Sequence, residues 1–79
     1  MKVELRLFAS LSRYLPDGGG GNSRVIEVDG GLKITEMLDQ LEVPEDRRAV
    51  ILLNGIHANG DEPLKEGDRI GVFPPIAGG

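Results

Sequence analysis

Apolar and charged residues alternate at the start of the chain. In residues 2–8, aliphatic side chains occupy every second position and separate charged ones. This period of two predicts a half-buried β-strand with Val3, Leu5 and Leu7 on its inward face. Phe8 falls on the outward face at the strand's end, where the next segment covers the ring or the ring forms a contact surface. The pattern leaves both possibilities open.

A short helix is predicted directly after this strand. Leu11, Tyr14 and Leu15 have the spacing of one helical face. Ser10 is a candidate cap, and Pro16 ends the helix because proline cannot continue it.

Four consecutive glycines lie in the next segment, residues 17–22. Ordering glycine costs much backbone entropy, so we expect a mobile loop here. Nothing indicates a phosphate site, because no Gly-Lys-Ser/Thr follows the glycines. Residues 24–28 are β-branched and aliphatic, and we expect them to form a strand antiparallel to the first.

The middle of the chain carries the pattern of an amphipathic helix. Its apolar positions are Ile34, Met37, Leu38 and Leu41. Thr35 is the only good capping residue nearby, but the apolar stripe begins before it, so the first turn can start at Lys33. Val43-Pro44 is expected to end the helix, because a residue before proline avoids the helical region.

Residues 49–53 are continuously apolar, which predicts a central strand buried on both sides. Asn54-Gly55 is a strong hairpin signal, and residues 56–58 are expected to return as a short strand. A last strand is predicted at residues 69–73, where Gly71 indicates a bulge or a close approach by another group.

One helix and about five short strands predict an α+β domain whose main helix crosses one face of a mixed sheet. The rule for crossover connections favours a parallel strand pair in this sheet. The pattern alone does not tell which strands pair.

Composition narrows the function. The chain has 79 residues, no cysteine and a net charge of −4. The acidic balance argues against nucleic acid as a partner and favours a partner with a basic docking face. Arg47 and Arg48 follow two acidic residues and are interpreted as a solvated turn.

The absence of cysteine fits the cytoplasm, and no apolar run indicates a signal peptide or a membrane span. His57 is the only histidine, and no further ligands or triad partners are located by the sequence, so it is interpreted as a surface or structural residue. We expect no metal site.

The C-terminal segment, residues 73–79, has features of a functional tail. Pro74 and Pro75 cannot donate ladder hydrogen bonds, so they should end the last strand and project the chain outward. Gly78 and Gly79 have no Cβ and can pass through a narrow slot in a partner. A frayed chain end is the alternative, but disordered ends are usually polar, and this one follows an apolar segment.

In these segments the chain resembles the ubiquitin-like sulfur-carrier proteins, most closely the small subunit of molybdopterin synthase, with thiamine sulfur carriers as relatives. The matching segments are residues 7–11, 53–55, 64–68 and 73–79. The loop at 17–22 is more glycine-rich than the family pattern.

The resemblance implies a β-grasp domain over residues 1–73 and a flexible tail over residues 74–79. It implies a protein co-substrate without catalytic residues or bound cofactor. It further implies that an E1-like adenylating enzyme uses ATP to activate the Gly79 carboxylate, and that a sulfur donor system converts it to a thiocarboxylate. Ala77 and Gly78 would belong to the tail that enters each partner. The sulfur acceptor in the closest relatives is the pterin precursor of the molybdenum cofactor, bound in the large, catalytic subunit of molybdopterin synthase.

We expect the partner surface to centre on apolar residues near the tail, because such residues would form one patch beside the site of chemistry. These residues are Phe8, Phe73, Pro74, Pro75 and Ile76. The residues do not tell which pathway receives the sulfur: thiamine, tungsten-cofactor and other routes use the same handle. A ubiquitin-like modifier conjugated through Gly79 and a plain interaction module are further alternatives.

Overall fold

The computed structural model describes residues 1–16 and 21–75 of the chain. Among them are five strands, one α-helix and two 3₁₀ turns. In chain order the elements are β1 (Lys2–Leu7), η1 (Ala9–Tyr14), β2 (Ser23–Glu27), α1 (Ile34–Gln40), η3 (Glu45–Arg47), β3 (Val50–Leu53), β4 (Ile56–Ala58) and β5 (Arg69–Phe73).

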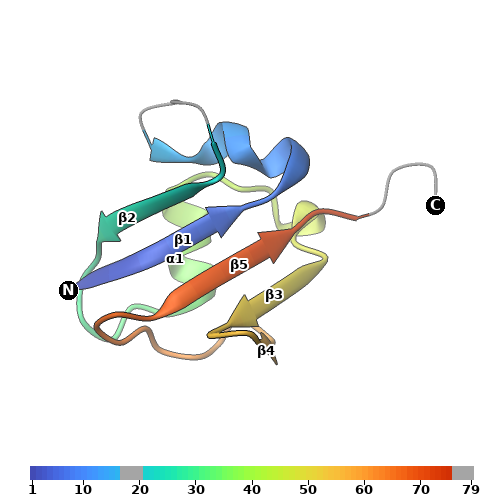
Figure 1. The fold of residues 1–79 in the computed structure, drawn as a ribbon. Helices are drawn as coiled ribbons and strands as arrows, with labels where there is room; N and C mark the ends of the chain where they lie inside the picture. The colour runs from blue at the N-terminus through green and yellow to red at the C-terminus, as the bar shows by residue number, and fades with distance from the viewer. Residues whose placement is uncertain (17–20, 76–79) are drawn as a thin grey trace.

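The strands form one mixed sheet in the order β2-β1-β5-β3-β4. β1 is antiparallel to β2 and parallel to β5, and β3 is antiparallel to both β5 and β4. The parallel pair requires a crossover, and α1 lies within it against one face of the sheet (Figure 1). The predicted α+β class and the β-grasp arrangement are confirmed.

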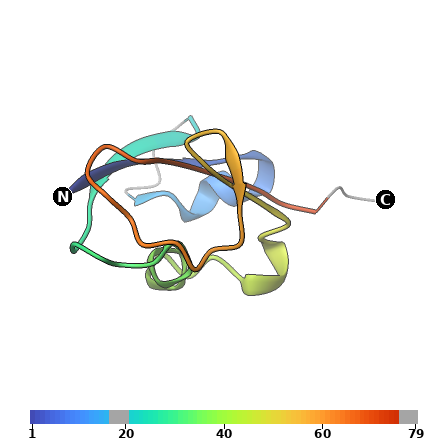
Figure 2. The same cartoon turned by 90° about the horizontal axis from the view of Figure 1, so that it is seen from below.

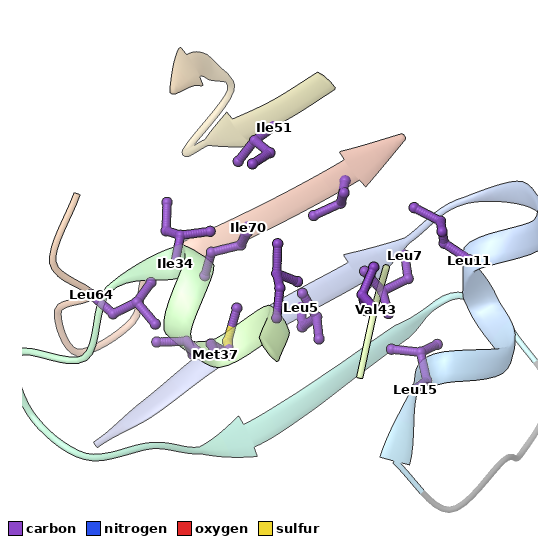
Figure 3. Close-up of a cluster of buried hydrophobic side chains, with 13 residues drawn as sticks. Leu5, Leu7, Leu11, Leu15, Ile34, Met37, Val43, Ile51, Leu64 and Ile70 are labelled. Carbon is purple, nitrogen blue, oxygen red and sulfur yellow. The ribbon is translucent and has the colours of Figure 1, made fainter. Parts of the chain in front are cut away.

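The core lies between α1 and the sheet, where inward side chains of alternate strand positions meet the helix (Figure 3). Val3, Leu5 and Leu7 are each at most 1% exposed, as the alternation in β1 predicts. Ile70 and Val72 of β5 are buried beside them. The buried side chains are Val3, Leu5, Leu7, Leu11, Leu15, Ile34, Met37, Leu38, Val43, Ile51, Leu64, Ile70 and Val72.

α1 begins at Ile34, with Lys33 as the residue before it. The Glu36 carboxylate accepts a hydrogen bond from the backbone N–H of Lys33, at 2.8 Å. The loop before β5 satisfies two further N–H groups of the first turn. The Glu62 carbonyl accepts from Ile34 and the Gly60 carbonyl accepts from Thr35.

The helix ends at Gln40, three residues earlier than the proline predicts. Glu42 lies in the left-handed region with a φ of 64°, and its N–H donates to the Asp39 carbonyl. The N–H of Val43 donates to the Leu38 carbonyl. These two hydrogen bonds form a Schellman motif, so the helix ends before the chain reaches Pro44.

Three further predictions are corrected. Ser10 does not cap η1, which follows Phe8 and has no side-chain hydrogen bond at its start. The second strand covers residues 23–27 rather than 24–28. The strand predicted at 49–53 covers Val50–Leu53 and is an interior strand between β5 and β4, but it is not buried on both sides, since only Ile51 is buried.

Arg48 does not belong to a solvated turn. Its side chain is 6% exposed, and its Nη2 donates to Asp39 Oδ1 at 2.7 Å and to the Val43 carbonyl at 2.6 Å. Because Asp39 lies on α1 and Arg48 lies two residues before β3, the guanidinium connects the helix to the segment that leads into the sheet.

Candidate functional site

The candidate site lies on the face of the sheet opposite α1, which we call the open face. It consists of the outward side chains of β1, β5 and β3. Both α1 and η3 lie on the other side of the sheet (Figure 2). The open face therefore presents strand side chains that neither of these two elements covers.

Two aromatic rings meet at one end of this face. The rings of Phe8 and Phe73 are stacked, with centroids 4.2 Å apart and planes inclined by 6°. Phe8 directly follows β1 and Phe73 ends β5, and because these strands are parallel their carboxyl ends share one edge. For Phe8, the sequence left open whether the ring is covered or forms a contact surface, and the structure shows each in part. The ring is half-buried against Phe73 and still borders the open face.

The ring of Phe8 lies over Gly71. A Cβ at Gly71 would lie 3.4 Å from Phe8 Cε2, an ordinary contact distance. The pairing continues without interruption through Gly71, which is opposite Arg6 on β1 and Leu52 on β3. Of the two predictions for this glycine, the bulge is wrong, and the group that approaches it is the Phe8 ring, at a distance that a Cβ would also allow.

Beside the rings is a groove of about 190 Å³, which we call the aromatic groove. The Asn54-Gly55 turn borders one end, and both of its residues have positive φ, as a two-residue hairpin turn requires. The groove is lined by Arg6, Phe8, Leu52, Gly55, Arg69, Ile70, Gly71 and Phe73.

Charged groups surround the aromatic groove. Arg6 Nε donates to Glu4 Oε2 at 2.7 Å, and the Ser23 hydroxyl donates to the same oxygen at 3.2 Å. The hydrogen bond from Arg6 is the largest cause that holds the pKa of Glu4 below its usual value, and partial desolvation opposes it. In the described part of the chain, the Arg69 side chain makes neither a hydrogen bond nor an ion pair.

The C-terminal segment leaves the sheet at this same edge. Phe73 is opposite Val50, and its carbonyl accepts a hydrogen bond from Ala49 at 2.9 Å, which anchors the end of β5. No strand residue follows Phe73 up to Pro75, as the two prolines predict, and the chain projects from the sheet (Figure 1).

Of the five residues predicted to bind a partner, the structure brings Phe8 and Phe73 together. Pro74 is half-buried and Pro75 exposed just beyond them. Ile76, the fifth, and the tail residues Ala77, Gly78 and Gly79 lie outside the described residues.

Of the eight residues that line the groove, sequence reasoning assigned only Phe8 and Phe73 to a partner surface; the others are Arg6, Leu52, Gly55, Arg69, Ile70 and Gly71. Leu52 was expected in a strand buried on both sides. The common location of these residues follows from the register, which places Arg6 and Leu52 on either side of Gly71. The alternation in residues 2–8 indicates an outward Arg6, but no sequence signal shows the strand pairing that brings it to the groove.

A second hollow lies between α1 and β3 and is lined by polar groups, with Arg48 and Asp39 among them. Both residues are joined in the ion pair that ties the helix to the sheet. His57 is exposed on β4, opposite the groove residue Leu52, and is not among the residues that line either hollow.

Within residues 1–16 and 21–75, no three histidine, cysteine or acidic side chains are grouped as metal ligands would be. No helix among these residues has the length and apolar character needed to cross a membrane.

The family model of the ThiS family matches residues 5–79. The fold is similar to SAMP1 from Haloferax volcanii, with a TM-score of 0.74, 27% identity and full coverage of both chains. A second structure, H. volcanii small archaeal modifier protein 1, has a TM-score of 0.72 and 26% identity, and covers 95% of this chain and 98% of that one.

Another similar structure is a complex of subunits 1 and 2 of molybdopterin-converting factor from Helicobacter pylori. It matches with a TM-score of 0.60, 27% identity and full coverage of both chains. Among curated proteins, none matches the chain closely enough to count as a relative.

Proposed function

Since this chain belongs to the ThiS family of ubiquitin-like sulfur carriers, we propose that it carries sulfur as a thiocarboxylate on Gly79. In the first step, a carboxylate oxygen of Gly79 attacks the α-phosphorus of ATP on an activating partner, and pyrophosphate leaves. A sulfide equivalent from a sulfur donor system then attacks the acyl carbon. The C–S bond forms, the acyl C–O bond breaks and AMP leaves.

The chemistry needs an activating partner. A carboxylate is a poor acyl electrophile until it gains a good leaving group, and the adenylate supplies one. ATP is therefore bound by the activating enzyme, and this chain acts as its protein substrate. The carrier's own contributions are a docking surface and a narrow end that reaches the partner's active site.

The observation that carries the proposal is the position of the aromatic groove at the base of the C-terminal segment. Phe73 belongs to both: its ring borders the groove, and its backbone is the last strand residue before Pro74. A partner that docks on the open face therefore holds the chain where the segment begins. Partial burial of Phe8 and Phe73 leaves apolar surface for this contact.

We further propose that the sulfur goes to the pterin precursor of the molybdenum cofactor, bound by the large subunit of a molybdopterin synthase. Support comes from the H. pylori structure, in which subunit 1 of molybdopterin-converting factor is in complex with subunit 2. Thiamine and tungsten-cofactor routes are the competing destinations.

A second function is favoured by the two H. volcanii structures, because one of them is a small archaeal modifier protein. In that case a lysine amine attacks the activated Gly79 carbonyl, an isopeptide bond forms and AMP leaves. The activation step is the same, so the two functions differ only in the nucleophile.

The test is mass spectrometry of the chain isolated from its native host, and of the chain incubated with ATP, a sulfide source and the activating enzyme of the same organism. Replacement of one oxygen by sulfur on Gly79 supports the carrier. Peptides that join Gly79 to lysines of other proteins support the modifier. An unmodified terminus in both samples would show that the proposed function is wrong.

A further inference from the structure

The charge at the aromatic groove is opposite in sign to the charge of the whole chain. The chain has 13 acidic and nine basic residues, and its net charge of −4 favours a basic partner surface. Two arginines, Arg6 and Arg69, line the groove, and no acidic residue is among its lining residues. Charges interact mainly within a Debye length of about 8 Å. The charges at the groove, and not the net charge of the chain, therefore determine which charge a docking partner should carry there.

The two arginines differ in how far their donors are engaged. Arg6 uses Nε for Glu4, and the Ser23 hydroxyl also donates to this carboxylate. Glu4 also lies opposite Arg69 in the β1–β5 register, and the hydrogen bond from Arg6 and the charges of both arginines lower its pKa, so it offsets part of the positive charge beside the groove. Arg69 is exposed, and within residues 1–16 and 21–75 its guanidinium has no hydrogen-bond or ion-pair partner. A planar group with five donors remains available for a carboxylate from outside the chain.

Hydrogen bonds hold the backbone of Arg69 in place, although its guanidinium has no hydrogen-bond or ion-pair partner among the described residues. Its N–H donates to Asn54 Oδ1 at 2.9 Å, and its carbonyl accepts from the N–H of Asn54 at 2.8 Å. The start of β5 is therefore held against the hairpin that borders the groove. Because the backbone that carries the guanidinium is already fixed, binding a carboxylate orders only the side chain and so costs less conformational entropy.

We propose that the aromatic groove receives an apolar side chain from an acidic segment of the activating enzyme, and that Arg69 selects this segment by binding its carboxylate. The proposal rests on the proposed function, since it names the partner chemistry of the same surface. Phe8, Phe73 and Leu52 supply the apolar contact, and Arg69 supplies the charge. Arg6 contributes less because Glu4 already engages it.

The consequence is electrostatic steering. A charge at the rim of an interface mainly changes the association rate and its dependence on salt, and steering changes such rates by about 10–10³-fold. Arg69→Glu should lower the association rate constant with the activating enzyme about tenfold at low ionic strength. Arg69→Lys keeps the charge and should retain most of the rate.

The experiment measures association and dissociation rates of the full chain with the activating enzyme of the same organism, at low and at high salt. Lys33→Glu is the matched control, because it makes the same change of charge next to α1, on the other side of the sheet. We expect this variant to stay within about twofold of the wild type, and high salt to remove most of the Arg69→Glu defect. A melting curve verifies that each variant is folded.

Two outcomes would overturn the inference: Arg69→Glu associating as fast as the wild type at low salt, or Lys33→Glu losing as much rate as Arg69→Glu. In either case, a wild-type chain that is still adenylated leaves the proposed function intact. A wild-type chain that the enzyme neither binds nor adenylates overturns the proposed function together with this inference.

Discussion

Gly71 shows how one missing side chain shapes the docking surface. A Cβ at this position meets Phe8 Cε2 at 3.4 Å, an ordinary van der Waals distance, so alanine fits beside the ring, whereas the two methyl groups of valine would crowd it. We expect Gly71→Val to displace Phe8 and fill part of the aromatic groove. Valine favours strands, and this face is not the core, so the melting temperature should stay constant or rise.

The measurement for Gly71→Val is the dissociation constant with the activating enzyme, beside a melting curve. Gly71→Ala should lie between the wild type and the valine variant. A folded Gly71→Val chain that binds as tightly as the wild type would show that the groove is not the docking site.

At the scale of elements, the C-terminus of α1 contains avoidable strain. Glu42 adopts a φ of 64°, which costs an L-residue roughly 1–2 kcal/mol and costs glycine almost nothing. Glu42→Gly should therefore stabilise the domain by about 0.5–1 kcal/mol, since glycine is more flexible when unfolded. Glu42→Ala keeps the strain and is the control. Urea unfolding measures the free energy of unfolding of both variants. A glycine variant that is less stable than the wild type would show that Glu42 is not strained.

The loop at residues 59–62 makes the stability of the fold near the start of α1 depend on pH. The Glu62 carboxylate accepts hydrogen bonds from its own N–H and from those of Asn59 and Gly60, and these bonds lower its pKa below 4.5. A lowered folded-state pKa stabilises the fold above the unfolded value, and this stabilisation is lost as the pH falls through the folded value. The same loop gives two carbonyls to the first turn of α1.

We therefore expect Glu62→Gln to lower the melting temperature at neutral pH. The difference from the wild type should shrink as the pH falls from about 7 to about 3, because the acid form of Glu62 resembles glutamine. Melting curves across this range test it. A difference that is constant with pH would assign the loss to packing instead of to the carboxylate.

The sequence predicts which segments form strands and helices better than it predicts which of these elements pair. The alternation in β1 and the Asn54-Gly55 turn are local signals, and both were predicted correctly. The pairing of β3 is not local, and a run of apolar residues looks the same in a central strand as in one with a half-exposed face. The end of α1 depends on Glu42, a residue without the usual preference for its conformation.

The candidate site was predicted in part for the same reason. Phe8 and Phe73 stand out as apolar residues near strand ends, and their stacking needs only the parallel pair. Arg69 and Arg6 become neighbours of one groove through the register of three strands, which no sequence period reveals. The buried position of Arg48 likewise depends on Asp39, nine residues away on α1.

At the scale of the whole molecule, the fold and the chemistry are separable. Among the described residues the last buried side chain is Val72, and we expect the removal of Gly79 to leave the melting temperature unchanged. The same deletion moves the terminal carboxylate back by about 3.5 Å, whereas a misplacement of about 1 Å can cost roughly a hundredfold in rate. ATP-dependent adenylation by the activating enzyme is the assay, and adding one residue after Gly79 is the matched change in the other direction. Because the aromatic groove is untouched, both variants should still bind the enzyme, which separates docking from chemistry. A chain without Gly79 that is adenylated at the wild-type rate would show that the reaction does not depend on this terminus.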